Sequence, residues 1–165
     1  MSDAMIPTPV ARRARRVLER VCDEELRLST AESCTGGLVA ALFTDIEGCS
    51  HAFERGLVVY SAEAKHEMLG VPAEVLDTCR AVSREAAVAM AEGALARSQA
   101  DLAVSVTGFA GPAGDEGTEG HVHFALARSG VATEHREEAF GAIGRDAIRH
   151  RCLETVLEML ESSFP

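Results

Sequence analysis

The stretch that decides the fold is residues 26–43, which read LRLSTAESCTGGLVAALF. Residues 26–31 have the pattern of a short strand, and residues 38–43 form an apolar segment typical of a buried helix. Hydroxyl side chains and the paired glycines Gly36 and Gly37 lie between them. In open α/β sheets, ligands bind where the carboxyl end of a strand leads into a helix. We therefore expect this loop to lie at the functional edge of a sheet.

The same alternation of strands and helices continues on both sides of this stretch. Helices are expected at residues 10–23, 62–69 (after Ser61 and before Gly70), 72–78, 84–98 (after Ser83) and 143–161. Strands are expected at residues 53–60, a β-rich run suited to a central strand, at 102–106, and as a hairpin at 121–128 and 133–140. The pattern predicts one layered α/β/α domain with a mixed sheet over residues 1–165, with residues 1–8 as a flexible tail.

Composition excludes several classes of protein. Of 165 residues, 47% are hydrophobic and 25% charged, and the net charge is −10. No apolar run approaches the ~20 residues that cross a bilayer, and an acidic chain lacks the basic stripe of a nucleic-acid surface. The five cysteines are scattered and odd in number, which favours reduced thiols. We expect a cytoplasmic protein without nucleic-acid or membrane partners, and a homo-oligomer stays open.

Lysine and tyrosine each occur only once, as Lys65 and Tyr60. Apart from Lys65, every residue counted as lysine or arginine is an arginine. Arginine is not deprotonated in proteins, but a buried lysine can be. A strand at residues 53–60 separates Ser50 from Lys65, and we expect both to reach one edge of the sheet, where a neutral lysine could activate a serine. Spacing alone favours the alternative of a turn serine, a core tyrosine and a surface lysine.

Two glycine-containing loops are candidates for ligand binding. The loop with Ser33, Thr35 and Gly36 precedes an apolar helix, so its backbone N–H groups could hold an anion or an oxyanion, although serine and threonine are also ordinary helix caps. The loop that starts at Thr107 and Gly108 lacks bulky side chains, so it can approach a phosphate or carboxamide closely. No Lys-Ser/Thr pair follows, which excludes a Walker P-loop.

Taken together, these segments resemble the CinA C-terminal domain family. The strings that carry the resemblance are TAESCTGG at residues 30–37, FERG at 53–56, YSAEAK at 60–65, MLGV at 68–71 and VTGFAGP at 106–112, with further matches at residues 81–83, 91–94 and 143–145. They run in order through nearly the whole chain. The resemblance implies the family's layered α/β fold and hydrolysis of nicotinamide mononucleotide to nicotinate mononucleotide and ammonia, without a metal or other cofactor.

The resemblance also implies roles for individual residues. It makes Ser50 the nucleophile, Lys65 its base and Tyr60 an orienting or relaying group. It further places Ser33, Thr107 and Arg145 at the site. Thr107, Gly108 and Arg145 are then candidates for binding the ribose phosphate, because arginine binds phosphate through a fork of N–H donors.

Departures from the family pattern keep two other functions open. The segment 113–120 is shorter and more acidic than in the family and lacks a Lys-Pro pair, and negative charge beside a phosphate site opposes the substrate. The chain could therefore be an amidase for another small amide. It could also be a non-catalytic accessory or binding module, since the family takes its name from competence and DNA damage.

Two further features have both a structural and a chemical interpretation. His121 and His123 would share one face of a strand, a spacing open to metal binding, but without a third ligand we interpret them as ordinary strand residues. Cys34 lies at a helix start, where a thiol pKa can fall. It is an alternative nucleophile or, more simply, a small packed side chain.

Overall fold

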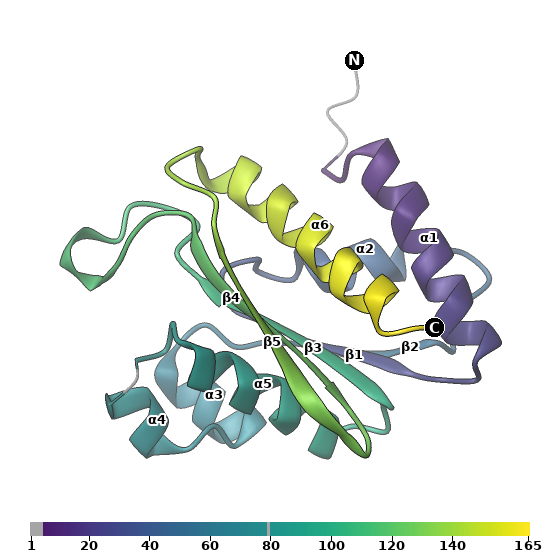
Figure 1. Cartoon of the computed structure of the whole chain (residues 1–165), viewed down its shortest axis with the longest axis horizontal. Coiled ribbons are helices and arrows are strands. Elements are labelled where there is room, and N and C mark those ends of the chain that lie inside the picture. Colours follow the sequence, from purple (N-terminus) through teal and green to yellow (C-terminus); the bar gives the residue numbers. More distant parts are fainter. Residues whose placement is uncertain (1–4, 79) are drawn as a thin grey trace.

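A computed structural model describes residues 5–78 and 80–165, so Cys79 and residues 1–4 lie outside the description that follows. Its centre is a five-stranded sheet in the order β2-β1-β3-β4-β5 (Figure 1). The strands are β1 (Leu28–Glu32), β2 (Phe53–Val58), β3 (Leu102–Gly108), β4 (His121–Arg128) and β5 (Val131–Ala139). Strand β1 runs parallel to β2 and β3, whereas β4 is antiparallel to β3 and β5. The predicted mixed sheet is confirmed.

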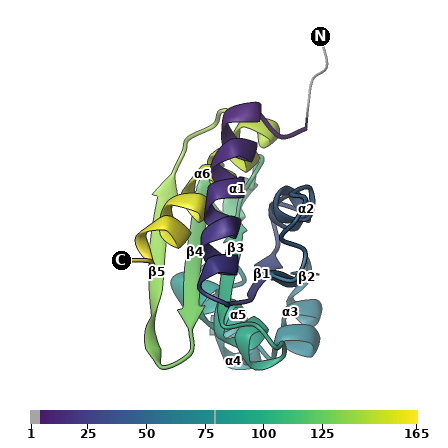
Figure 2. The same cartoon turned by 90° about the vertical axis from the view of Figure 1, so that its right-hand side faces the viewer.

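Helices cover both faces of this sheet. One face carries α1 (Thr8–Asp23), α2 (Leu38–Thr44) and α6 (Arg145–Ser162). The other carries α3 (Ala62–Leu69), α4 (Ala73–Thr78) and α5 (Arg84–Ala96) (Figure 1). Helices α1 and α6 lie side by side along their face (Figure 2). The predicted α/β/α layering is therefore confirmed.

The core has a separate part on each face of the sheet. On the side of α1, α2 and α6, large side chains such as Phe43, Phe124 and Leu157 fill the space. On the side of α3 and α5 the packing is thinner and rich in alanine, with Ala91 of α5 against Ala125 of β4. Small side chains let α5 approach the sheet closely, as its alanine content indicates.

The predicted position of the strand at residues 53–60 is wrong. It was expected in the centre of the sheet, but β2 is an edge strand, and Val58 is 47% exposed. The central place beside it belongs to β1, all of whose residues are buried. Gly56 of β2 allows α2 to pack closely, because a Cβ at this position would lie 2.7 Å from the Cβ of Ala40 in α2. Leu57 and Val59 pack against the cluster of α3 and α5, whereas Val58 is exposed, so the apolar run reflects burial on that one face rather than on both.

Local signals set the bounds of several helices as predicted. The Ser61 Oγ accepts a hydrogen bond from the Ala64 N–H at 3.0 Å and begins α3, which ends at Gly70 with a φ of +66°. The Ser83 Oγ accepts one from the Ala86 N–H at 3.0 Å and begins α5. A side-chain oxygen satisfies an N–H that has no partner within the helix, and glycine adopts the left-handed conformation without strain.

The predicted flexible tail at residues 1–8 does not include its described part, residues 5–8. Helix α1 already begins at Thr8, Ile6 packs against the core, and the carbonyl oxygen of Met5 accepts a hydrogen bond from His150 Nε2 at 3.0 Å. The rest of that segment, residues 1–4, is outside the described part. Among the described residues, none of the helices combines the length and the apolar character that a membrane span requires.

Candidate active site

The carboxyl ends of β1, β2 and β3 converge on one pocket of about 360 Å³. Ser33 follows β1, Tyr60 and Lys65 follow β2, and Thr107 and Gly108 end β3. Strand β1 lies between β2 on one side and β3 on the other, so the chain order reverses at β1. Ligands of open α/β sheets bind at the carboxyl ends of the strands next to such a reversal. Six of the residues predicted for the site line the pocket, namely Ser33, Tyr60, Lys65, Thr107, Gly108 and Arg145.

Lys65 is buried at the bottom of this pocket, with only 1% of its surface exposed. Its Nζ lies 3.1 Å from the Oγ of Ser33 and 3.2 Å from the carbonyl oxygens of both Val59 and Tyr60. A protonated amine donates all three hydrogen bonds. A neutral amine donates two, to the carbonyls, and its lone pair accepts the Ser33 hydroxyl proton. The same geometry thus fits both protonation states.

Burial lowers the pKa of Lys65, because the charged form loses its hydration, and only a weak opposing effect of Cys34 raises it. Within the described residues no carboxylate forms an ion pair with this amine. A buried cation without an anionic partner is costly, so the neutral amine is favoured. The fold therefore shifts the only lysine toward the neutral form, which is the form that can act as a base.

Ser33 is fixed by its backbone. Its N–H donates to the Val106 carbonyl of β3 at 3.0 Å, and its carbonyl accepts from the Gly36 N–H at 3.1 Å. The residue is 7% exposed, and its Oγ faces Lys65. Sequence reasoning placed Ser33 at the site but did not pair it with the lysine.

The expectation that Ser50 and Lys65 reach one edge of the sheet is wrong. Ser50 lies before the first residue of β2 and Lys65 beyond its last, and β2 runs parallel to β1. A strand of six residues spans about 20 Å, so the two lie at opposite edges. Neighbouring His51 contacts Cys22, which lies in the last turn of α1, and Ser50 itself is exposed. Residues that precede and follow the same strand lie at opposite ends of that strand, so they cannot meet at one end of the sheet.

The start of helix α2 already holds a carboxylate from the protein itself. The buried side chain of Glu32 accepts hydrogen bonds from the N–H groups of Gly37, Val39 and Ala40 and from the hydroxyl of Thr35, at 2.7–3.1 Å. The sequence suggested these donors as a binding site for a substrate anion. They are not free for that role, because Glu32 already occupies them. The next residues after Ser33 differ, because the Cys34 and Thr35 N–H groups donate to no carbonyl or carboxylate in the described part of the chain.

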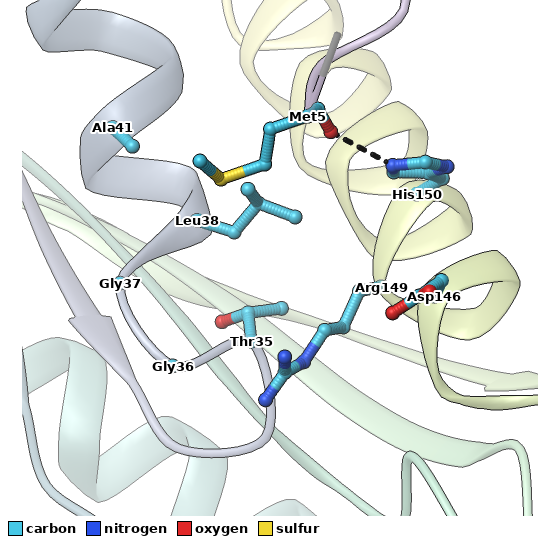
Figure 3. A pocket seen from close by; sticks show the side chains of 9 residues that line it. All are labelled: Met5, Thr35, Gly36, Gly37, Leu38, Ala41, Asp146, Arg149 and His150. Carbon is cyan, nitrogen blue, oxygen red and sulfur yellow. Dashed lines mark hydrogen bonds between the residues drawn. The ribbon is translucent and has the colours of Figure 1, made fainter. Parts of the chain in front are cut away.

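Thr35 and Gly36 do not join the pocket of Lys65. They line a second cavity of about 620 Å³, which lies between the α2 start and α6 (Figure 3). Figure 3 shows the Arg149 side chain reaching from α6 toward this loop, where its Nε donates to the Cys34 carbonyl at 3.0 Å. The predicted substrate-binding role of Thr35 and Gly36 thus has no support from the geometry. We assign them to the Glu32 cap and the packing of α6.

Thr107 and Gly108 shape the wall of the pocket formed by β3. The Thr107 hydroxyl donates to the Ala81 carbonyl at 2.7 Å, which orients its side chain. Gly108 has no room for a side chain, because a Cβ there would lie 2.7 Å from the His121 carbonyl oxygen. The glycine therefore follows from packing between β3 and β4 as well as from any approach of a ligand.

Arg145, the first residue of α6, is an exposed cation at the rim of the pocket. No hydrogen bond or ion pair to its guanidinium occurs among the described residues, and it lies against Gly111, where a Cβ would meet its Nη2 at 2.7 Å. Glu116, in a 3-10 turn at Gly114–Glu116, lines the same pocket. The rim thus combines one unpaired cation with one acid from the segment that departs from the family pattern.

Tyr60 contributes differently from what its hydroxyl suggested. Its carbonyl oxygen, not its phenol, contacts Lys65, and its side chain is 75% exposed while it lines the pocket. The ring is therefore free to contact a ligand.

Cys34 also lines the pocket and is 4% exposed, and its pKa is lowered through a hydrogen bond with the Cys152 thiol. That thiol pair was not foreseen, because the two residues are 118 positions apart.

The fold defines a three-layer α/β protein with a buried serine–lysine contact at the carboxyl ends of its parallel strands, a contact of the kind that serine–lysine hydrolases use. Sequence comparison makes the assignment specific. The chain belongs to the family described as the CinA C-terminal domain, which matches residues 10–164.

Relatives and solved structures agree with this membership. The chain is 47% identical over 139 residues to the nicotinamide-nucleotide amidohydrolase PncC of Escherichia coli K12, which covers 83% of this chain and 84% of that protein. It is 45% identical to a putative competence-damage inducible protein of Caldicellulosiruptor bescii, but spans only 31% of its length. The crystal structure of the competence/damage inducible protein CihA from Agrobacterium tumefaciens matches with a TM-score of 0.92 and 45% identity, over 96% of this chain and 98% of that one.

Proposed function

We propose that the protein hydrolyses the carboxamide of a nicotinamide nucleotide, with nicotinamide mononucleotide as substrate and nicotinate mononucleotide and ammonia as products. The observation that carries the proposal is the contact between the Lys65 Nζ and the Ser33 Oγ in a pocket with the unpaired Arg145 at its rim. The name of the E. coli relative, nicotinamide-nucleotide amidohydrolase, supports the same reaction.

We assign the nucleophile to Ser33 instead of Ser50. The neutral Lys65 amine takes the hydroxyl proton while the Ser33 Oγ attacks the carboxamide carbon. The protonated amine then gives this proton to the departing nitrogen, so ammonia leaves and an acyl-serine remains. Water, deprotonated by the same amine, attacks the acyl carbon, and the amine returns that proton to the Ser33 Oγ as the acyl C–O bond breaks and the acid leaves. Each proton taken by Lys65 is returned, so its cycle is complete.

The oxyanion of each tetrahedral intermediate needs hydrogen-bond donors. The Cys34 N–H directly follows the nucleophile, belongs to a residue that lines the pocket, and has no carbonyl or carboxylate acceptor within the described residues. A backbone N–H in this position stabilises developing negative charge without reorganisation. The Glu32 carboxylate holds the next part of the loop, so this donor stays fixed during the reaction.

The two ends of the substrate have opposite charges, and the pocket offers a group for each. Arg145 is the candidate for the phosphate, since a guanidinium donates two parallel hydrogen bonds to it. The exposed Tyr60 ring can lie against the pyridinium, because a cation is attracted to an aromatic face. Thr107 and Gly108 form the wall between them.

Glu116 favours a second candidate function. This residue lines the pocket that also holds Arg145, and a carboxylate repels a phosphate dianion. An amide that lacks the phosphate would avoid this repulsion, so the enzyme could act on another small amide. The buried lysine–serine contact speaks against a purely accessory module, because burying an amine without an anionic partner has no stabilising benefit.

Ammonia release from nicotinamide mononucleotide, nicotinamide and glutamine, measured side by side, separates these functions. The proposal expects kcat/KM to be highest for the mononucleotide. Faster turnover of either phosphate-free amide would support the second candidate, and no ammonia from any of them would support the accessory module. We further propose the cytoplasm as the place of action, in keeping with the four described cysteines, which are free thiols and form no disulfide.

A further inference from the structure

Four polar side chains gather on the hairpin of β4 and β5, outside the pocket of Lys65. His121 and His123 lie two positions apart on β4, and His135 and Glu137 lie two positions apart on β5. His123 and Glu137 are direct partners in the antiparallel register. Residues two apart on a strand share a face, and Ala125 of β4, two positions beyond His123, packs against α5. All four side chains therefore share the face that α5 covers.

The separations within this group are short. His121 Nε2 lies 2.5 Å from Glu137 Oε1, and His123 Nδ1 lies 3.1 Å from His135 Nε2. One ligand atom from each of His121, His123 and Glu137 can be chosen so that all lie within 4.8 Å of one another. Ligands bound to one zinc ion at about 2.0–2.2 Å are at most about 4 Å apart, so small side-chain rotations would close the set around an ion.

The ligand types also suit a cation. His121, His123 and His135 offer imidazole nitrogens, and Glu137 offers carboxylate oxygens. Of the neighbouring charges at the start of α5, Glu85 favours a cation here and Arg84 opposes it. Neutral imidazole and carboxylate are ligands for first-row divalent metals.

We propose that this hairpin binds a divalent transition-metal ion of the zinc class through His121, His123 and Glu137. The ion takes the place of the proton between His121 Nε2 and Glu137 Oε1. His123 binds through Nε2 and donates its Nδ1 proton to His135, which thereby orients the ligand from outside, as a partner of a metal-bound histidine commonly does. Sequence reasoning saw only the first two histidines, because the third ligand comes from the neighbouring strand.

The site serves stability rather than catalysis. None of the three ligands lines the pocket that contains Ser33 and Lys65. Strand β5 is an edge strand, and only one side of it is hydrogen-bonded to the sheet. A metal that joins β4 to β5 holds this edge in place, because binding to the folded state alone stabilises it.

The test is a titration of the metal-free protein with Co²⁺ and Zn²⁺. We expect one equivalent of Co²⁺ to give a visible spectrum of nitrogen and oxygen ligands, Zn²⁺ to displace it, and Zn²⁺ to raise the unfolding temperature. His121→Gln and Glu137→Gln should each weaken binding at least tenfold and abolish the temperature shift. His121 and Glu137 are partly exposed, with side-chain exposures of 33% and 53%, so these variants should fold.

His150→Gln is the matched control, since it removes an imidazole from α6, away from the hairpin, and should bind as the unsubstituted protein does. Three results would overturn the proposal. They are no binding at micromolar metal, binding unchanged in both hairpin variants, and a cobalt spectrum with thiolate charge-transfer bands, which would assign the metal to cysteine. Circular dichroism of each variant confirms that lost binding is not lost folding.

Discussion

The Nζ of Lys65 lies 3.1 Å from the Oγ of Ser33, although 32 positions separate the two residues in the chain. The contact arises because β1 and β2 are parallel neighbours, so the residues that follow each strand meet at one edge of the sheet. Both side chains are buried there and have no charged partner among the described residues. The contact singles out Ser33 as the serine that Lys65 can activate, and Ser50 is the serine to compare with it.

Ser33→Ala should abolish ammonia release, with a loss of about 10³-fold or more in kcat, because no other hydroxyl of the described residues contacts the lysine. Ser50→Ala is the matched control and should retain activity, since Ser50 is exposed at the opposite edge. Both variants should unfold at nearly the same temperature as the unsubstituted protein. The opposite result, an active Ser33→Ala and an inactive Ser50→Ala, would restore the prediction made from the family resemblance.

Lys65→Arg should lower kcat by about 10²–10⁴, because a guanidinium cannot accept a proton at working pH. The pH profile of the unsubstituted enzyme gives a second measurement. Burial lowers the pKa of Lys65, so activity should be retained above that lowered pKa and fall as the pH drops through it. An amine resonance of this only lysine that titrates at its ordinary value would contradict the mechanism.

Arg145→Ala should raise KM for the nucleotide by about 10–100-fold with little change in kcat, since a lost charge-assisted phosphate contact costs about 1.5–3 kcal/mol. Activity on a phosphate-free amide should not change. Arg151→Ala, which removes another exposed arginine of α6 that does not line the pocket, serves as the control. An equal effect in both variants would indicate a role in the helix instead.

Glu116→Gln should lower KM for the nucleotide about two- to fivefold, because a partly exposed charge contributes only ~1 kcal/mol or less. The difference from the unsubstituted enzyme should shrink at high salt, which screens exposed charges. Glu119→Gln, in the same segment but outside the pocket lining, should have a smaller effect. If both variants leave KM unchanged, the acidic segment does not oppose the substrate.

Glu32→Gln should reduce the free energy of unfolding by roughly 1.5–3 kcal/mol, because a carboxylate that accepts four hydrogen bonds becomes an amide with one acceptor oxygen. Thr35→Ala removes only one of the donors and should cost less. Urea unfolding measures both. Equal stability of Glu32→Gln and the unsubstituted protein would mean that the loop does not depend on this cap.

Much of the fold could be predicted from local pattern. The caps at Ser61 and Ser83 and the stop at Gly70 fix helix ends through contacts within a few residues, which sequence displays directly. The strand at residues 53–60 was recognised but given the wrong place. Its apolar residues indicate a β-strand, but burial against α3 and α5 on one face and burial in the sheet centre give similar composition.

The sequence by itself determined the α/β class, the family, and the singular Lys65, because these depend on composition, period and short motifs. Only the tertiary structure decided which residues meet. Strand direction brings Ser33 to Lys65 and carries Ser50 to the far edge, and strand pairing adds Glu137 to two histidines. The physical reason is that the direction and register of paired strands are set by contacts between segments distant in sequence, which spacing along one segment does not encode.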